Sequence, residues 1–487
     1  MINLPFLRRY QSVTLFACAL LCVFGSKLTV LDRYGTDLPY MDQWGKEADW
    51  VLARLLEGDP AWLNRALLPH NEHRIYFTIG TDVALALLSG QWDARQECVV
   101  SALLHATIAA SLAAFTWRRL PGAWRVVAAA LVVLLAATPL AWDNVLWGFQ
   151  SQFYFLIGFS LLGIDGLIRE KFSRRWFLGL LAMLCALVSM GSGFFCALAV
   201  LPLLLRDTLA DGRAWRATWA SLLAAAGILA LGWQFHFQPA WHAGLRAENA
   251  SNFLTYAAHC LAWPLTTHVA FGALFYSPLL VLGARWLLRG APSGAAGHTM
   301  KFTLAAGGWV LLQIAALAYA RGHSGGLPAS RYGDVFAVGI VANAFALGLL
   351  APQEARRGWA FWATTWLAVI ALGAAIQLAK IYREDLPQHR REFRAFEATV
   401  RSYLTDGDAD ALRTRPIPFP DYDWFLRLLD RPSIRAMLPP SVSYPHRVSA
   451  LSAAARNLSK WGWAFIVLGV AGVLLAASGR DRRPVNP

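Results

Sequence analysis

Continuous apolar segments recur along most of the chain and alternate with short polar loops. Each segment is about 18–22 residues long, the length that an α-helix needs to cross the roughly 30 Å hydrocarbon core of a bilayer. The short loops that we assign to one side are rich in Arg and Lys, as is typical of cytoplasmic loops. The pattern predicts an all-α polytopic membrane protein with about twelve transmembrane helices.

Two polar stretches interrupt this pattern and define the expected organisation. Residues 1–382 are predicted to form the transmembrane module, and residues 32–97 within it form a long first external loop. Residues 383–460, which carry both charges and several prolines, are predicted to form a small external segment. Residues 461–487 then supply the last transmembrane helix and the tail.

The first external loop contains two predicted helices that do not span the membrane. From Asp42 to Glu57 apolar residues recur at helical spacing, which predicts a helix lying along the membrane surface. The apolar segment from Ile75 to Leu88 is short for a span, and a crossing there would place the basic loop after Trp117 outside. We therefore expect this segment to dip into the interface, with the true second span at 99–117.

The orientation follows from the charges at the two ends. Arg8 and Arg9 precede the first span, and the basic sequence GRDRRP at 479–484 follows the last one. Cytoplasmic segments next to spans carry an excess of Arg and Lys, so both termini are predicted to be cytoplasmic. In a bacterial inner membrane, the first loop and residues 383–460 then face the periplasm.

Composition and charge narrow the function classes. The chain is 57% hydrophobic and only 15% charged, against about 25% charged in soluble domains. Its net charge of +14 comes mostly from short loops, and no basic tract interleaved with aromatic residues predicts a nucleic-acid partner. The six cysteines show no C-x-x-C spacing, so the sequence contains no zinc or redox motif.

The first external loop concentrates residues that can carry chemistry. The Asp42 carboxylate can act as a general base or hold a cation against phosphates, or it can simply cap the predicted surface helix. His70, Glu72, His73 and Arg74 can bind an anion such as a phosphate. Two histidines are too few for a metal site, so no metal ligands are assigned, while a divalent cation is left open. The alternative is a polar cap over an interfacial helix.

Two further external loops offer binding groups. Asp143, Asn144 and Gln150 combine with tryptophans in the second loop, and amides with aromatic rings are what a sugar site uses. An interfacial aromatic belt would look similar. A later Gly-rich loop carries Arg321, Arg331 and Tyr332, and its two arginines can clamp a lipid phosphate. The alternative for that loop is an ordinary polar connector.

In this order of features the first half of the chain resembles the membrane-embedded glycosyltransferases of the GT-C superfamily. These carry an acidic residue soon after the first span, matched here by Asp42, then surface helices and a dipping helix, matched by Ile75–Leu88. The short helices predicted at 177–189 and 194–205 are also similar. The first external loop has no D-x-D motif and has Asp42-Gln43 where some members have an Asp-Glu pair, so the resemblance does not decide metal dependence.

The resemblance implies an inverting hexosyl- or pentosyltransferase of the cell envelope. The donor would be a sugar on a polyprenyl phosphate such as undecaprenyl phosphate, and the acceptor a lipid, glycan or protein. Asp42 would deprotonate the acceptor hydroxyl. From charge and placement alone, we expect Arg74, Arg331 and His73 to bind the donor phosphate and stabilise the charge that develops on it.

The sequence is also compatible with other functions. An O-antigen polymerase or ligase would rely on external Arg and His residues, so Arg321, Arg331 and residues 383–460 would matter more than Asp42. A lipid-linked sugar flippase or transporter would need ionisable residues inside the spans, where His105 and Asp165 are the obvious ones. A homodimeric structural protein would leave the polar loops unexplained.

Overall fold

The computed structural model describes residues 11–210, 215–351 and 357–478. Within these ranges the chain is all-helical, and extended pairing is limited to one isolated bridge between His70 and His73. The basic residues that set the expected orientation of the termini, Arg8, Arg9 and those at 479–484, lie outside the described residues.

Seven helices in the described part are long and apolar enough to cross a membrane. They are α2 (Gln11–Tyr34), α6 (Ala94–Arg119), α12 (Trp215–Phe235), α14 (Phe271–Arg289), α15 (Gly294–Arg321), α16 (Gly333–Leu350) and the continuous helix formed by α17 (Arg357–Lys380), a π-helical turn (Ile381–Asp385) and α18 (Leu386–Asp406). An eighth is added if α22 (Ala450–Lys460) and α23 (Gly462–Ser478), which meet at a 52° bend, count as one span. The polytopic helical architecture is thus supported.

The predicted number of about twelve spans is not reached by these criteria. Four of the expected spans are present as helices of 14 to 17 residues, each shorter than a full crossing: α7 (Trp124–Ala137), α9 (Ser151–Leu167), α10 (Arg174–Leu187) and α11 (Phe195–Ala210). The remaining elements of the bundle are short: α8 (Trp142–Leu146), a 3₁₀ turn (Gly148–Gln150), another (Ala240–Leu245), α13 (Ala250–Leu261), and turns at His323–Gly325 and Ser330–Tyr332.

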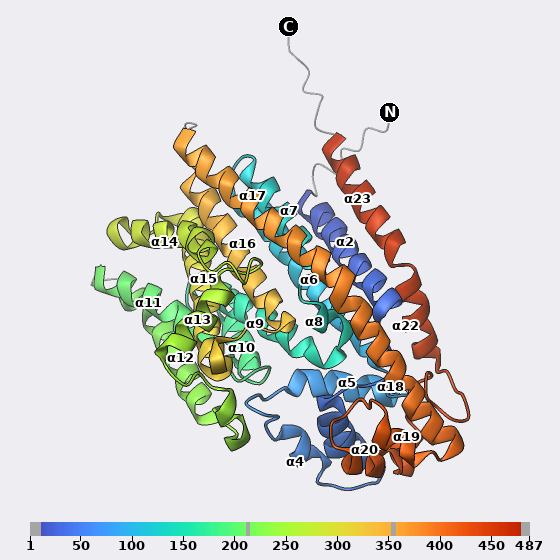
Figure 1. Cartoon of the computed structure of the whole chain (residues 1–487). Coiled ribbons are helices and arrows are strands. Elements are labelled where there is room, and N and C mark those ends of the chain that lie inside the picture. The colour runs from blue at the N-terminus through green and yellow to red at the C-terminus, as the bar shows by residue number, and fades with distance from the viewer. Residues whose placement is uncertain (1–10, 211–214, 352–356, 479–487) are drawn as a thin grey trace.

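The first and last helices of the described chain lie side by side (Figure 1). Their backbones approach closely because small residues meet at the contact. A Cβ atom placed on Gly25 of α2 would lie 2.5 Å from the carbonyl oxygen of Gly462. Further along, Gly469 and Gly472 of α23 face Cys22 and Cys18 in the same way. Small residues are what allow helices to pack closely in an apolar surrounding.

At one end of the bundle two distant segments, residues 35–93 and 386–449, pack into one unit that we call the head (Figure 1). Its shorter elements are a π-helix (Gln43–Leu52), α3 (Ala53–Leu56), α4 (Trp62–Leu67), α5 (Tyr76–Ser89), α19 (Ala409–Thr414), α20 (Tyr422–Leu429) and α21 (Pro432–Arg435). The Trp44 ring makes edge-to-face contacts with Trp92 and Phe425, at centroid distances of 4.8 and 4.7 Å. The head therefore has its own hydrophobic core.

This packing corrects one expectation from the sequence. The stretch after Asp42 is helical as predicted, but its apolar face does not lie along a membrane surface. Trp44, Val51 and Leu52 are at most 1% exposed and belong to the core shared with the C-terminal segment. The apolar spacing was correct, but a single sequence does not tell whether lipid or a distant part of the chain covers an apolar helix face.

Candidate active site

A polar cavity of about 390 Å³ lies where the head meets the bundle. It brings together residues from six separate stretches of the chain: the start of the π-helix, the turn at 70–73, the 142–153 region, Met190, the 321–332 loop and α18. Of the residues that the sequence singles out, the following line it: Asp42, His70, Glu72, His73, Asp143, Gln150, Arg321, Arg331 and Tyr332. Asn144 and Arg74 do not.

Asp42 stands at the N-terminal end of the π-helix, but its side chain makes no capping hydrogen bond. The preceding Met41 has a positive φ of 48°, and its N–H donates to the Pro418 carbonyl oxygen at 2.8 Å, which ties this corner to the C-terminal segment. The Asp42 carboxylate is 41% exposed and has the ring of His70 as its partner, with Oδ1 3.4 Å from Nε2. The carboxylate is therefore available to the cavity, and the capping alternative is not what the geometry shows.

The segment from His70 to His73 forms a tight turn that presents its side chains to the cavity. The backbone N–H and C=O groups of the two histidines bond to each other at 2.7 and 2.9 Å, and Asn71 between them has a φ of 50°. Glu72 accepts two hydrogen bonds from Arg321, at 2.9 and 3.1 Å, and lies 2.6 Å from His242 Nδ1. The turn is thereby anchored to two distant parts of the bundle.

The electrostatics of this turn fix its protonation states. Burial alone would raise the pKa of Glu72, but the hydrogen bond from Arg321, the neighbouring His73 ring and the contact with His242 lower it to about 2. Burial lowers the pKa of His73 to about 4, so its ring is neutral, and its Nδ1 accepts the N–H of Gly191 at 3.2 Å. Because these groups bind one another, they do not converge on a single point as metal ligands would.

Another wall of the polar cavity contains Asp143 and Gln150, two of the residues that the sequence associates with sugar binding. Burial raises the pKa of Asp143, and its backbone N–H donates to the Ser330 hydroxyl at 3.3 Å. Asn144 is buried behind the wall, where its amide donates to the Arg331 carbonyl oxygen at 2.8 Å and to Asp334 at 2.9 Å. Asn144 therefore positions the Arg331 loop instead of facing the cavity.

Arg74 is not placed where the sequence analysis expected it. Its guanidinium donates to the Tyr76 hydroxyl at 3.1 Å and to the Leu67 carbonyl oxygen at 3.3 Å, and lies over the Phe235 ring, 4.9 Å from its centroid. It does not line the cavity. The expected contact of Arg74 with a donor phosphate there is therefore not supported, because residues 70–73 line the cavity while Arg74 bonds to Leu67 and Tyr76 instead.

Residues of α18 complete the cavity and were not identified from the sequence. His389, Glu392 and Phe393 line it, and Tyr40 packs on Phe393 with ring centroids 4.9 Å apart. The available signal was the helical spacing of Leu386, His389, Phe393, Phe396 and Val400, all of which are buried. That spacing predicts a covered helix face but not what covers it.

A second, largely apolar pocket of about 400 Å³ adjoins the polar cavity. The two share the residues Glu72, His73, Phe153, Met190, Arg321 and Tyr332 as a common wall. The rest of the apolar pocket is lined mainly by hydrophobic side chains of α9, α11, α15 and α16. The paired Glu72 and Arg321 thus stand at the boundary between a polar and an apolar space.

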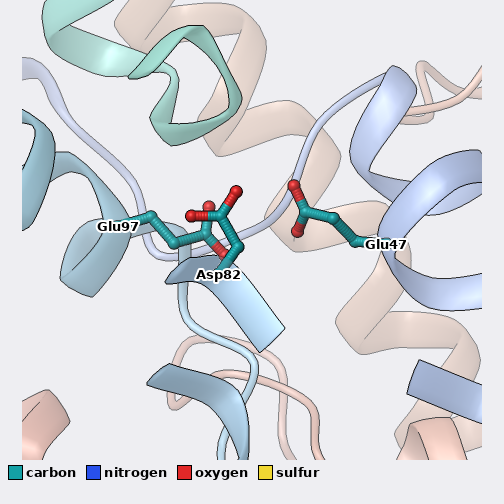
Figure 2. A group of neighbouring side chains, drawn as sticks. All are labelled: Glu47, Asp82 and Glu97. Carbon is teal, nitrogen blue, oxygen red and sulfur yellow. The ribbon is translucent and has the colours of Figure 1, made fainter. Parts of the chain in front are cut away.

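Three buried carboxyl groups, two from the head and one from α6, meet next to this site (Figure 2). Oxygen atoms of Glu47, Asp82 and Glu97 lie within 4.8 Å of one another, and no ion pair to a basic group is present within the described residues. Gln43, the neighbour of Asp42, donates to Glu97 at 2.6 Å, and Trp92 donates to Glu47 at 2.8 Å. Burial raises the pKa of Glu47 to about 7.

This trio, and not the His70–His73 turn, is the group in the described chain that could hold a cation. Carboxylate oxygens suit hard divalent ions such as Mg²⁺ and Ca²⁺. Protons shared among the three carboxyl groups would neutralise the trio equally well, since buried carboxyl groups close together cannot all ionise. No pattern in the sequence indicates the trio, because its members come from three different helices.

The bundle also contains ionisable side chains that the sequence analysis only partly recognised. His105 Nε2 lies 3.9 Å from Asp334 Oδ1, and Lys27 Nζ lies 3.4 Å from the Tyr154 hydroxyl, all buried. Asp165 instead pairs with Arg169 at 2.7 Å and with His298 of α15 at 2.7 Å. The group that contains His105 and Asp334 connects through Asn144 to the Arg331 loop, so it supports the floor of the polar cavity.

No protein-family model, curated protein or solved structure matches this chain. The resemblance to GT-C enzymes therefore stays a prediction from the sequence.

Proposed function

We propose that the protein is a membrane glycosyltransferase that moves a sugar from a polyprenyl-phosphate donor to an acceptor hydroxyl. The observation that supports this most is the pairing of a polar and an apolar cavity across one wall, with Arg321 and Tyr332 in that wall. A lipid-linked sugar has the same division, a polar sugar phosphate on a long hydrocarbon chain. The apolar pocket would take the chain and the polar cavity the sugar.

Two arginines would hold the phosphate between these spaces. Arg321 is already in a bidentate pair with Glu72, which fixes its position. Arg331 lines the polar cavity and makes no ion pair with any described residue, so its charge is available to an anion. A preorganised cation beside the leaving phosphate stabilises the negative charge that develops there.

Asp42 would act as the general base. Its carboxylate takes the proton of the acceptor hydroxyl while the hydroxyl oxygen forms a bond to the anomeric carbon. The bond from that carbon to the phosphate oxygen breaks, and the polyprenyl phosphate leaves with both electrons, so the sugar is transferred with inversion. The Asp42 side chain is suited to this role because it is partly exposed in the cavity and uses no oxygen for capping.

The expected setting is the periplasmic face of a bacterial inner membrane, with both termini in the cytoplasm. The acceptor would be a lipid, a glycan or a protein, and it would reach Asp42 from the side of the head. His389 and Glu392 of α18 line the cavity on that side. The carboxylate trio would supply a cation site if the reaction or the fold needs one, without a direct role for the ion in the steps above.

The decisive test replaces Asp42 by Asn and measures sugar transfer from a synthetic lipid-linked sugar by the purified protein. We expect transfer to fall at least about 100-fold, since general-base catalysis contributes typically 10²–10⁴-fold. Asp423→Asn, an exposed carboxylate in the head with no ion pair among the described residues, is the matched control and should transfer normally. Normal transfer by the Asp42→Asn protein would exclude the assignment.

One alternative has its own support in the structure. A polymerase or ligase of the O-antigen type would depend on external Arg and His residues, and Arg321, Arg331, His70 and His389 do line the cavity. That reading predicts that Arg331→Ala abolishes activity while Asp42→Asn spares it. A lipid-sugar transporter would use the ionisable group around Lys27 and His105, and should move substrate without forming a new glycosidic bond.

A further inference from the structure

A third cavity, of about 850 Å³, opens between the end of α2, one face of α18 and the C-terminal half of α22. It touches the polar cavity at Phe393, which lines both. Its walls carry seven Arg and Lys side chains against three Asp and Glu side chains. We call it the basic cleft. None of the roles described so far uses it.

The positive charge of the basic cleft comes first from α18. Arg390, Arg394 and Arg401 lie on one face of this helix together with Glu397, since their spacing of four, three and four residues follows the helical period. Arg390 and Arg394 make no ion pair or hydrogen bond with any described residue. Like charges four residues apart destabilise a helix, and among the described residues of this face only Glu397 offsets the three arginines.

The wall of the basic cleft that faces α18, formed by α22 and the start of α6, adds further cations, and one of their N–H groups has no hydrogen-bond partner among the described residues. Arg456 is paired with Asp37 at 2.8 Å, whereas Lys460 makes no ion pair in the described chain. Arg95 uses its two terminal nitrogens on the Leu31 and Gly35 carbonyl oxygens, while its buried Nε has no partner among the described residues. The cleft thus holds more positive charge than its own carboxylates neutralise.

The basic cleft lies at the level where helices leave the apolar part of the bundle. Arg33, on its wall, is in the last turn of the apolar helix α2, and Lys460 stands at the bend where α23 begins. Trp461 and Trp463, next to that bend, are 59% and 57% exposed. Exposed tryptophans at the ends of apolar helices mark the membrane–water interface, where lipid headgroups lie.

We propose that the basic cleft binds the phosphate-bearing headgroup of an anionic membrane lipid. Arg390 and Arg394 contact the phosphate as a pair, and Arg33 and Lys460 approach it from the bundle side. The acyl chains stay in the bilayer beside α2 and α23. This binding is separate from the proposed sugar transfer, and it holds or fails whether or not the protein has that activity.

The test measures binding to the purified full-length protein with three probes: dihexanoyl phosphatidylglycerol, dihexanoyl phosphatidylcholine and inorganic phosphate. We expect the anionic lipid to bind at least about tenfold more tightly than the other two. The double variant Arg390→Ala/Arg394→Ala should lose about 25-fold in affinity, because each cation near an anionic lipid surface contributes roughly 1 kcal/mol, a factor of about five. Added salt should weaken the binding.

The matched control is Arg383→Ala/Arg391→Ala, which removes the same charge from exposed positions outside the cleft. Its affinity should stay within about twofold of wild type, and Arg390→Lys/Arg394→Lys should keep most of the binding because it keeps the charge. Equal binding of both lipids, or equal loss in both alanine pairs, would overturn the proposal. Inorganic phosphate binding as tightly as the anionic lipid would show a soluble anion as the ligand and would also overturn it.

Discussion

The imidazole Nε2 of His70 lies 3.4 Å from Oδ1 of Asp42. The two residues come from separate elements of the head, Asp42 from the start of the π-helix and His70 from the tight turn before α5. A ring at this distance can orient the carboxylate and leave its other oxygen free to accept a proton. The pair is therefore the part of the cavity where a general base is best held.

His70→Ala should slow sugar transfer through kcat, with little change in KM for the donor. We expect a loss of about tenfold or more, smaller than for Asp42→Asn, because the base remains but is less well oriented. Steady-state kinetics on the purified variant would measure both constants. His268→Ala, an exposed histidine outside the polar cavity, is the control. An unchanged kcat would mean that the contact between His70 and Asp42 does not assist the reaction.

The Glu72 ion pair predicts a specific dependence of stability on acid pH. The folded pKa of about 2 lies below the ordinary value of 4.5, because Arg321, His73 and His242 outweigh the effect of burial. A carboxylate with a depressed folded pKa contributes stability above its unfolded pKa, and that contribution is lost as pH falls from about 4.5 towards 2. The melting temperature of the wild type should therefore fall on going from pH 6 to pH 3.

Glu72→Gln should melt at a lower temperature than the wild type at pH 6 and show a smaller further decrease at pH 3. Glu170→Gln, an exposed glutamate with no ion pair in the described part, should follow the wild type at both pH values. Parallel melting curves for wild type and Glu72→Gln at both values would contradict the role of this ion pair.

Much of the candidate site could be found from residue type and loop position alone. Nine of the eleven residues chosen from the sequence line the polar cavity. They were recognisable because a polar cluster between apolar segments is unusual in a membrane protein, and such a cluster therefore indicates function. Arg74 was misplaced because residue type does not say where a side chain points in a tight turn.

The parts that were missed depend on contacts between distant segments. His389 and Glu392 come from α18, and the carboxylate trio comes from three helices, so no local pattern connects them. The same limit explains the surface helix at 42–57, whose apolar face is covered by α20 and its neighbours. Local spacing predicts helices and their apolar faces; which surfaces meet is decided by the tertiary fold.

The close contact of α2 with α23 can be tested without an activity assay. Gly25→Val would place new atoms within 3 Å of the Gly462 carbonyl oxygen and the Phe465 side chain, so the helices must move apart. Overpacking of this kind costs about 1–3 kcal/mol, and a lower melting temperature is expected in detergent. Gly227→Val is the matched control, since nothing lies within 4 Å of a Cβ atom there. Equal melting temperatures for the two variants would exclude the close packing.

The carboxylate trio predicts the opposite pH trend from Glu72. Burial raises the folded pKa of Glu47 to about 7, above its ordinary value of 4.5, and Asp82 and Glu97 face it from α5 and α6. A raised carboxyl pKa means that the stability is complete below about pH 4.5 and is lost as pH rises through 7. With chelator present, the melting temperature should fall from pH 6 to pH 8.

Glu47→Gln should reduce that decrease, because it removes one charge from the trio and keeps an oxygen that can accept the Trp92 hydrogen bond. Asp410→Asn, an exposed aspartate of the head with no ion pair among the described residues, should melt like the wild type at both pH values. Without chelator, Ca²⁺ or Mg²⁺ should raise the melting temperature of the wild type at pH 8 more than that of Glu47→Gln if the trio takes a cation. If neither pH nor divalent ions distinguish the two proteins, the trio neither stores protons nor binds metal.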